Sequence, residues 1–402
     1  MMTPEEFLTS HGFILAEDID RTRYISLLTD EMKKGLNKEP SSLGMYWSFI
    51  TPKRRTLAGK RVAVLDAGGT NFRGGIVEFG KGISEFKLQP MPGAEQEVSE
   101  AEFYQAFKDE VKRLLPNANV PKVGWCFSYP AETTPELDAK LIKWTKNIKA
   151  PAIVGQLVGE KLGVSVSVVN DTVATLLAAD ATANGKAYSS YIGFILGTGT
   201  NAAYVDPKLQ MVINAESGNF DKFPQSDFDK AVDQKSGNPG HQFLEKMIAG
   251  AYLGDIGLEI LKSAARAGYF SKAGAGIIMG KSALSTKDLS EFCDGTYPTR
   301  LDADDTRIAV RFVLPVFERA ATLAAIELAA FVIQSGGGYD ENEPVAICID
   351  GSTYYKTSCI DFPSVVKHEL DEILVRQRNV HYEIVPKVDD APMYGAAIAA
   401  LS

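Results

Sequence analysis

A pattern of two apolar runs separated by a glycine-rich turn occurs twice in this chain, and it constrains the fold more than any other feature. The first copy covers residues 61–79, with the sequence Gly-Thr-Asn at residues 69–71. The second covers residues 191–205, with Gly-Thr-Asn at residues 199–201. Apolar runs bounded by glycine-rich turns are typical of strands, because glycine adopts the backbone conformations that tight turns require. The repeat therefore predicts two similar halves, each containing a pair of strands.

Helical patterns separate these strands along the chain. A further strand with a glycine turn is expected at residues 345–352, and a helix is expected to begin at Pro4, where Thr3 and Glu6 form a capping pattern. The other expected helices are residues 20–34, 99–115, 151–162, 171–183, 242–267, 304–334 and 364–376. A connector rich in Pro, Ser and Gly at residues 40–59 indicates a domain boundary. Strands that alternate with helices predict an α/β protein.

The composition excludes several classes of protein. With 402 residues, of which 45% are hydrophobic, the chain is long enough for two or three globular domains. Its 42 Lys and Arg against 51 Asp and Glu give a net charge of −9, so the chain lacks the basic surface of a nucleic-acid-binding protein. Backbone N–H groups still allow it to bind an anionic ligand.

No segment has the pattern of a membrane span or a signal peptide. The first residues are acidic, the uncharged stretch 187–205 is interrupted by a glycine-rich turn, and the alanine-rich run 320–333 is short and contains Glu327. The four cysteines show neither metal-ligand spacing nor a disulfide framework. We therefore expect a protein of the reducing cytoplasm, without a membrane or nucleic-acid partner.

The two Gly-Thr turns suggest a phosphate-binding site. Glycine allows the backbone to approach a phosphate closely, and the exposed N–H groups and Thr hydroxyls donate to its oxygens. Each turn alone is explained as well by an ordinary hairpin, but two copies, the first preceded by Asp66, favour a triphosphate site. Residues 275–282 nearly match a P-loop, with Ala275 replacing its first glycine. They lack the preceding strand and the following helix, so no P-loop is expected.

Polar residues at strand ends form a second group of candidates. Asp171 follows a predicted strand and begins a helix, where it either caps the helix or accepts a proton from a substrate hydroxyl at the sheet edge. Ser128 follows the strand at residues 123–127, residues 143–147 place lysines beside a tryptophan, and Glu216 lies in a turn after another strand. A surface loop or a plain turn explains each of the last three segments when it is taken alone.

Together these segments resemble the eukaryotic-type hexokinase family, in the family's order and along nearly the whole chain. The matching segments are residues 31–36, 41–45, 65–73, 127–130, 144–146, 170–171, 197–201, 213–218, 250–255 and 349–352. The chain departs from the family pattern at Asp255, where the family has Glu, and at Asn147 and Ile148, where it has Gly-Phe. At residues 391–394 this chain has Ala-Pro-Met-Tyr where the family has a turn of the Gly-Ser-Gly type. The contacts with the adenine base of the nucleotide are therefore expected to differ from those of the family.

The resemblance implies an actin-like ATPase fold, similar to ribonuclease H, with two α/β lobes around a central cleft. Residues 1–60 would form the N-terminal segment of the large lobe and residues 61–170 the small lobe. Residues 171–390 would form the large lobe, and residues 391–402 a C-terminal helix that returns to the small lobe. The implied reaction transfers the γ-phosphoryl group of ATP to the 6-hydroxyl of a hexose such as glucose or mannose, with Mg²⁺. A monomer or homodimer is expected.

The resemblance also implies roles for individual residues. Asp171 would accept the hydroxyl proton, with Lys146 and Arg73 beside the transferred group. The expected sugar-binding residues are Ser128, Thr145, Lys146, Asn170, Asp171, Asn201, Glu216 and Asp255. The expected nucleotide-binding residues are Asp66, Gly68, Gly69, Thr70, Asn71, Arg73, Gly197, Thr198, Gly199, Gly351 and Ser352. Asp66 would also hold Mg²⁺ through water.

Two further expectations accompany these roles. Asp255 is one methylene shorter than the Glu of the family, so it is expected to touch the sugar loosely. The alternative function is an actin-like or chaperone-type ATPase without a sugar substrate, which would have no use for the segments at residues 127–130 and 144–146.

Overall fold

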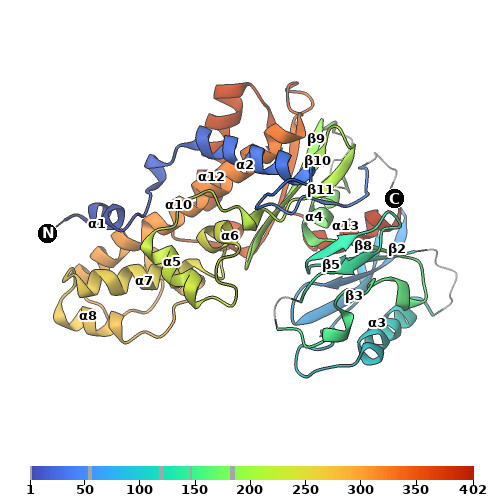
Figure 1. Cartoon of the computed structure of the whole chain (residues 1–402), viewed down its shortest axis with the longest axis horizontal. Helices are drawn as coiled ribbons and strands as arrows, with labels where there is room; N and C mark the ends of the chain where they lie inside the picture. The colour runs from blue at the N-terminus through green and yellow to red at the C-terminus, as the bar shows by residue number, and fades with distance from the viewer. Residues whose placement is uncertain (1, 53–56, 117–121, 145–146, 182–185) are drawn as a thin grey trace.

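The protein is an α/β molecule built on two main β-sheets, as its computed structural model shows for residues 2–52, 57–116, 122–144, 147–181 and 186–402. In Figure 1 the five-stranded sheet and helix α3 (Glu100–Leu114) form one body, and the six-stranded sheet and most helices form the other. Helices α4 (Asp171–Ala181) and α13 (Ala391–Ala400) lie where the two bodies meet. The α/β class predicted from the repeat is confirmed.

The smaller body contains the first copy of the repeat. Its strands are β2 (Arg61–Ala67), β3 (Asn71–Glu78), β4 (Gly82–Pro90), β5 (Val123–Phe127) and β8 (Val166–Val169), in the order β4-β3-β2-β5-β8. Strand β2 pairs antiparallel with β3 across the first glycine-rich turn and parallel with β5. A short hairpin, β6 (Ala131–Thr133) and β7 (Ala139–Leu141), follows β5. Ala63 and Leu65 pack beneath α3, whereas Val62 and Val64 face the other way, toward α13.

The larger body contains the second copy. Its sheet has the order β1-β11-β10-β9-β12-β13. The strands are β1 (Tyr46–Trp47), β9 (Ser190–Leu196), β10 (Thr200–Asp206), β11 (Met211–Asn214), β12 (Val345–Asp350) and β13 (Tyr382–Ile384). Strand β9 pairs antiparallel with β10 and parallel with β12. The hairpin-plus-parallel-strand arrangement of β2, β3 and β5 is thus repeated, as the sequence pattern predicts.

Helix α10 (Ala303–Ser335) runs through the core of the larger body. Its buried Arg319 forms two hydrogen bonds, of 2.9 and 2.7 Å, with the carboxylate of Asp229. The other α-helices here are α1 (Pro4–Ser10), α2 (Arg21–Leu36), α5 (Asp227–Lys235), α6 (Phe243–Ile248), α7 (Leu253–Arg266), α8 (Lys272–Met279), α9 (Thr286–Asp294), α11 (Ser352–Lys356) and α12 (Phe362–Leu370). Short turns are η1 (Ala16–Asp18), η2 (Pro151–Ile153), η3 (Glu160–Leu162), η4 (Ser217–Asn219) and the π-helical η5 (Asp371–Arg376). Within the described ranges, every helix is too short or too polar to cross a membrane.

Helices α4 and α13 pack against each other between the two sheets (Figure 1). Glycines allow this close approach. A Cβ atom on Gly395 of α13 would lie 1.9 Å from the Ala174 carbonyl oxygen of α4, and one on Gly124 of β5 would lie 2.1 Å from the Ala396 carbonyl oxygen. The last helix of the chain is therefore part of the core of the smaller body.

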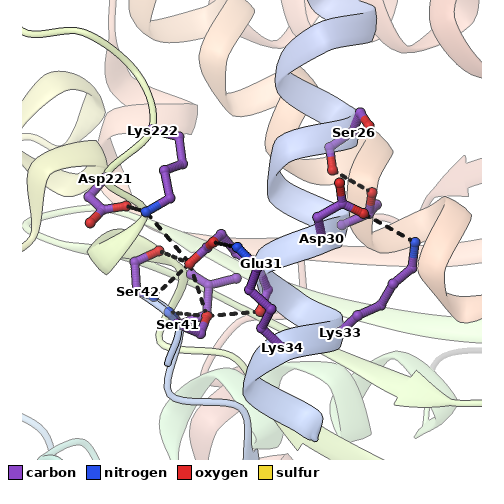
Figure 2. Close-up of polar contacts among 11 residues, drawn as sticks. Ser26, Asp30, Glu31, Lys33, Lys34, Ser41, Ser42, Asp221 and Lys222 are labelled. Atoms are coloured by element: carbon purple, nitrogen blue, oxygen red, sulfur yellow. Dashed lines mark hydrogen bonds and ion pairs between the residues drawn. The ribbon is translucent and has the colours of Figure 1, made fainter. Parts of the chain in front are cut away.

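A buried carboxylate fixes the start of the chain to the larger body (Figure 2). Glu31 on α2 accepts hydrogen bonds from the Ser42 backbone N–H at 2.8 Å and from Lys34 at 2.8 Å, and Lys222 lies 3.8 Å away. The Ser41 hydroxyl also donates to the Glu31 carbonyl at 2.8 Å. These contacts hold the segment that continues into β1, which lies beside β11 at the edge of the six-stranded sheet.

Some expected elements differ from those observed. The helix expected at residues 151–162 is replaced by the turns η2 and η3, and the one at 242–267 is divided into α6 and α7. The helix expected at 364–376 ends at Leu370 and continues as a π-helical turn. Most of residues 275–282 lie in α8, which confirms that they form no P-loop.

The expectation that the cysteines form no disulfide is wrong for one pair. Cys293 on α9 and Cys359 after α11 are joined as a disulfide, with their Cα atoms 5.1 Å apart. The two residues are 66 positions apart in the sequence, so only the packing of the helices brings them together. Cys126 and Cys348 are buried free thiols.

Candidate active site

The first glycine-rich turn lies beside two of the predicted site residues. Asp66, at the end of β2, accepts a hydrogen bond from Arg73 Nε at 2.7 Å. Burial raises the pKa of Asp66, and the Arg73 guanidinium opposes this shift only in part. A Cβ atom on Gly68 would lie 3.2 Å from Ser128 Oγ and 3.7 Å from Asp66 Oδ1, so Ser128 borders the same turn. The structure thus brings Asp66, Gly68, Arg73 and Ser128 together.

Arg73 also connects this turn to the C-terminal helix. Its second contact is with Asp390, the residue before α13, at 2.5 Å from Nη1 to Oδ1. Two carboxylates therefore hold the guanidinium at the edge of the smaller body. This arrangement fixes a positive charge near the turn formed by Gly69, Thr70 and Asn71.

The second glycine-rich turn lies directly against the third. A Cβ atom on Gly351 would lie 2.2 Å from the Leu196 carbonyl oxygen, and one on Gly197 would lie 3.3 Å from the Gly351 Cα atom. Gly351 has φ 126°, which glycine adopts far more easily than other residues. Thr353 donates a 2.8 Å hydrogen bond to the Gly197 carbonyl and joins the two turns. The predicted nucleotide residues Gly197, Thr198, Gly199, Gly351 and Ser352 therefore form one surface.

Asp171 lies between the two bodies at the first turn of α4. Asn170 and Asp171 each accept a hydrogen bond from the Thr172 backbone N–H, at 2.9 and 2.8 Å, so both side chains are oriented by the helix start. The charge of Asp171 raises the pKa of Asp66 in the smaller body and that of Glu216 in the larger one. The negative charge of Asp171 thus raises the pKa of one carboxyl group in each body.

A chain of side-chain hydrogen bonds fixes the predicted sugar residues of the larger body. Asn201 Nδ2 donates to Asn214 Oδ1 at 2.7 Å, and Asn214 Nδ2 donates to Glu216 Oε1 at 3.0 Å. Burial raises the pKa of Glu216 to about 7, the bond from Asn214 opposes this, and the charges of Asp171 and Glu245 add to it. Asn170 and Asn214 also line one cavity at the junction of the two bodies.

Glu245, on α6, is a site residue that the sequence analysis missed. Its Oε2 accepts a 3.0 Å hydrogen bond from the Thr200 backbone N–H, at the start of β10. A Cβ atom on Gly199 would lie 2.5 Å from the same oxygen, and one on Gly218 would lie 3.0 Å from Glu245 Cβ. Two glycines therefore make room for this carboxylate beside Glu216. The sequence gives no local sign of it, because the short helix α6 was expected to be the start of one long helix.

Asp255 takes no part in the hydrogen-bonded chain of Asn201, Asn214 and Glu216. It is exposed on the first turn of α7, and the charged groups that act on its pKa are Glu259 and Lys235. The charges of Asp171 and Glu245, by contrast, both raise the pKa of Glu216. Asp255 stays a predicted sugar contact, and Glu245 is a further carboxylate whose charge acts on Glu216.

The remaining predicted sugar residues follow Trp144 in the sequence. Thr145 and Lys146 are outside the described residues. Trp144, just before them, donates a 2.6 Å hydrogen bond to the Ala150 carbonyl and packs against Tyr129, so it belongs to the core of that body. The charge of Lys143 lowers the pKa of Glu216 across the junction of the two bodies.

The donor set of the site limits how a metal ion can bind. Across the described ranges, no three His, Cys, Asp or Glu side chains gather into a metal-binding group. Asp66 is one carboxylate at the edge of the first glycine-rich turn, whose backbone N–H groups are the predicted phosphate donors. Mg²⁺ usually keeps several waters and binds through one or two carboxylates together with substrate phosphates. This chemistry fits an ion carried by a nucleotide, and it does not fit a metal held by the protein alone.

Comparisons with known proteins agree along the whole chain. Two family models, both described as hexokinase, match residues 17–181 and 191–402. Hexokinase-7 of Oryza sativa subsp. japonica is 30% identical over 93% of this chain and 91% of its own length. Glucokinase-1 of Kluyveromyces lactis is 29% identical over 92% of both chains. The structure of the hexokinase from Schistosoma mansoni complexed with glucose superimposes with a TM-score of 0.78, at 25% identity, over 100% of both chains.

These matches cover both bodies and the segments that carry the candidate site. The order of the two glycine-rich turns, the helix start at Asp171 and the turn at Glu216 is the order that the family resemblance implies. The chain belongs to the hexokinase family.

Proposed function

We propose that this protein transfers the γ-phosphoryl group of ATP to the 6-hydroxyl of a hexose, with glucose as the first substrate to test. The observation that carries the proposal is the position of Asp171. Its charge acts on Asp66, beside the first glycine-rich turn, and on Glu216, in the polar cluster of the other body. A carboxylate between a phosphate-binding surface and a polyol-binding surface is suited to accept a proton from the attacking hydroxyl.

The sugar hydroxyls would bind to amides and carboxylates from both bodies. Asn201, Asn214, Glu216 and Glu245 form the side of the larger body, and each is held by hydrogen bonds of 3.0 Å or less. Ser128 and Asn170 supply polar groups from the other side, and Thr145 and Lys146 remain predicted contacts. Paired donors and acceptors of this kind discriminate strongly between sugars that have and lack a given hydroxyl.

The nucleotide would lie across the three glycine-rich turns. Backbone N–H groups of these turns would donate to phosphate oxygens, and Arg73 would supply a fixed positive charge near the transferred group. Phosphoryl transfer depends mainly on positioning and charge stabilisation, so the rigid contacts of Arg73 with Asp66 and Asp390 favour the reaction. A Mg²⁺ ion on the nucleotide would neutralise phosphate charge there, with Asp66 as the protein group nearest to it.

We keep the lobe boundaries of the sequence analysis as part of the proposal, with residues 61–170 as the small lobe and 391–402 as its returning helix. The pairing of β2 with β5 and the packing of α13 on both strands support this division. The predicted state of monomer or homodimer is to be decided by light scattering of the purified protein.

The direct test is a coupled assay of ADP release with glucose, mannose, fructose and N-acetylglucosamine as separate acceptors. Hexose-dependent ADP release that requires Mg²⁺, together with a sugar 6-phosphate identified by mass spectrometry, would support the proposal. ADP release at the same rate without any sugar would instead favour the alternative of an ATPase that has no sugar substrate.

A further inference from the structure

A buried carboxyl group lies in the middle of α10, and the proposed reaction does not use it. Glu327 is surrounded by alanine and other apolar residues and has an exposed fraction of 0%. In the described part of the chain, neither of its oxygens has a hydrogen-bond partner. Burying a polar group without a partner is costly, so a residue of this kind calls for a functional explanation.

The hydroxyl that faces Glu327 belongs to the turn after the sugar-binding carboxylate. Ser217 is also fully buried, and its Oγ likewise has no hydrogen-bond partner among the described residues. Burial raises the pKa of Glu327 to about 8, the nearby Ser217 hydroxyl lowers it, and the charge of Glu245 raises it further. The raised pKa favours the protonated form of Glu327 at neutral pH, and in that form its carboxyl group is able to donate to the Ser217 hydroxyl.

The turn that Ser217 begins holds Glu216 in an unfavourable backbone conformation. Glu216 has φ 53°, a left-handed conformation that needs support from its surroundings in a residue other than glycine. One support is Asn201, whose Oδ1 accepts a hydrogen bond from the Ser217 backbone N–H at 3.2 Å. The side chain of Ser217 is buried toward α10, so Glu327 is placed to support the same residue from the opposite side.

We propose that Glu327 is a positioning residue for sugar binding, which fixes the turn at residues 217–219 through Ser217 and so holds the Glu216 carboxylate in place. Glu327 does not touch the sugar. Its side chain acts through Ser217, and a change at residue 327 should therefore alter the binding of the hexose and leave the binding of ATP nearly unchanged. This inference rests on the proposed function.

Glu245 is the charged group that raises the pKa of Glu327. Lys246 of α6, Tyr204 of β10 and Arg319 of α10 itself have partners of their own. These partners are Asp233, Asp206 and Asp229, respectively. Ionisation of Glu327 would add a second negative charge beside Glu245 and weaken the packing of α6 against the turn.

The first test compares Glu327→Ala, Glu327→Gln and Leu328→Ala, with kcat and KM measured for glucose and ATP. Loss of the Glu327 carboxyl group beside Ser217 is expected to raise the KM for glucose about 5- to 30-fold in Glu327→Ala, with the KM for ATP changed less than about 3-fold. Glu327→Gln keeps the shape and a donor, and should restore the KM for glucose to within about 3-fold of the wild type. Leu328→Ala removes a buried side chain from the same helical turn and controls for general damage to the core.

The second test uses Ser217→Ala and pH. If Glu327 acts through Ser217, the Glu327→Ala substitution should have little further effect on the KM for glucose in a Ser217→Ala protein. Above about pH 8, the KM of the wild type should rise relative to that of Glu327→Gln, since only the wild type ionises at residue 327. Glu216 titrates in both proteins, so the ratio of the two KM values isolates residue 327.

The outcomes separate this inference from the proposed function. A Glu327→Ala protein that loses stability like Leu328→Ala but keeps its KM for glucose overturns the inference and leaves the function intact. If the effects of Ser217→Ala and Glu327→Ala on the KM for glucose simply add in the double variant, the inference is also overturned. If Glu327→Ala does not fold, the pH dependence of the KM ratio decides, and a flat ratio rejects the inference. A wild-type protein that phosphorylates no hexose overturns both.

Discussion

Asp171 is the residue on which the proposed chemistry depends most. Its carboxylate is oriented by the Thr172 backbone N–H at 2.8 Å and acts on charged groups of both bodies. Because a general base works on the reacting atoms and contributes little to the fold, replacing it should affect turnover more than binding or stability.

We expect Asp171→Ala to lower kcat by about 10²- to 10⁴-fold, the usual effect of removing a general base. The KM for ATP and the melting temperature should remain close to those of the wild type. Steady-state kinetics with glucose, together with thermal unfolding, measure both effects. A folded Asp171→Ala protein with near-wild-type turnover would show that another group takes the proton.

The carboxylates Glu245 and Asp255 provide a matched pair for testing the sugar site. Glu245→Ala removes the acceptor of the Thr200 backbone N–H and one of the charges beside Glu216, so the KM for glucose should rise about 10- to 100-fold. Asp255→Ala removes an exposed carboxylate beside Lys235 and Glu259, and we expect less than about a 3-fold change. The measurement is kcat/KM for glucose and mannose in both variants. Equal losses of kcat/KM in the two variants would show that Asp255 belongs to the sugar site.

Sequence reasoning predicted the parts of the site that follow from local pattern. Asp66 lies near the end of β2, and Asp171 and Glu216 lie two positions after the ends of β8 and β11. Such positions can be recognised from the order of apolar and polar residues. Glu245 and Asp255 lie in one region that looks continuously helical in the sequence. The break at residues 249–252 depends on Gly250, whose N–H donates to the Gly197 carbonyl at 2.7 Å, and such a distant contact leaves no local pattern.

At the scale of elements, the buried Glu31 carboxylate of α2 holds the segment at residues 41–42 in place. Glu31 joins the helix to residues 41–42 and to Lys222, and the chain then continues into β1 beside Asn214 (Figure 2). Burial acts to raise the pKa of Glu31, but Lys34, the Ser42 N–H and Lys222 outweigh it and lower that pKa to about 2. The ionised form is thus favoured in the folded protein.

This shift predicts a dependence of stability on pH. The ordinary pKa of Glu31 is 4.5, so its stabilising contribution is fully present above that pH and is lost as the pH falls toward about 2. At pH 7 we expect Glu31→Gln to lower the free energy of unfolding by roughly 2–3 kcal/mol. The difference from the wild type should shrink between about pH 4.5 and pH 2. Urea unfolding at several pH values measures it.

The control for this experiment lies one residue earlier on the same helix. Asp30 is exposed, and its contact with Lys33 is 3.4 Å long between two exposed side chains. Such surface pairs contribute about 0–1 kcal/mol, so Asp30→Asn should have little effect. A Glu31→Gln protein as stable as Asp30→Asn at pH 7 would mean that the hydrogen bonds of Glu31 do not hold the segment at residues 41–42.

At the scale of the whole molecule, the two bodies meet through α4 and α13 and face each other across the candidate site. The repeated hairpins, the α/β class and the order of the motifs were all predicted from the sequence, because they depend on apolar periodicity and glycine turns. The disulfide of Cys293 with Cys359 and the contact of Arg73 with Asp390 join residues 66 and 317 positions apart. Contacts of this kind depend on the final packing, so the sequence pattern alone did not reveal them.

Binding of glucose should draw the two bodies together, since the proposed sugar contacts come from both. Ser128 belongs to one body, whereas Asn201, Glu216 and Glu245 belong to the other. A ligand that contacts both bodies only when they are close shifts the population toward that state. Small-angle scattering should show a smaller radius of gyration with saturating glucose and no change with an equal concentration of sorbitol. An unchanged radius with glucose would contradict closure.

The position of α13 in the core of the smaller body has a consequence for biosynthesis. Strands β2 and β5 leave the ribosome early, but α13, the helix that covers one face of them, is made much later. Between Phe127 at the end of β5 and Ala391 at the start of α13 lie about 263 residues, which take roughly 13–53 s to synthesise at roughly 5–20 residues per second. During that time the apolar side chains of Val62, Val64 and Cys126 have no native cover. The nascent chain should therefore depend on chaperones until α13 emerges, and a chain released before that point should aggregate.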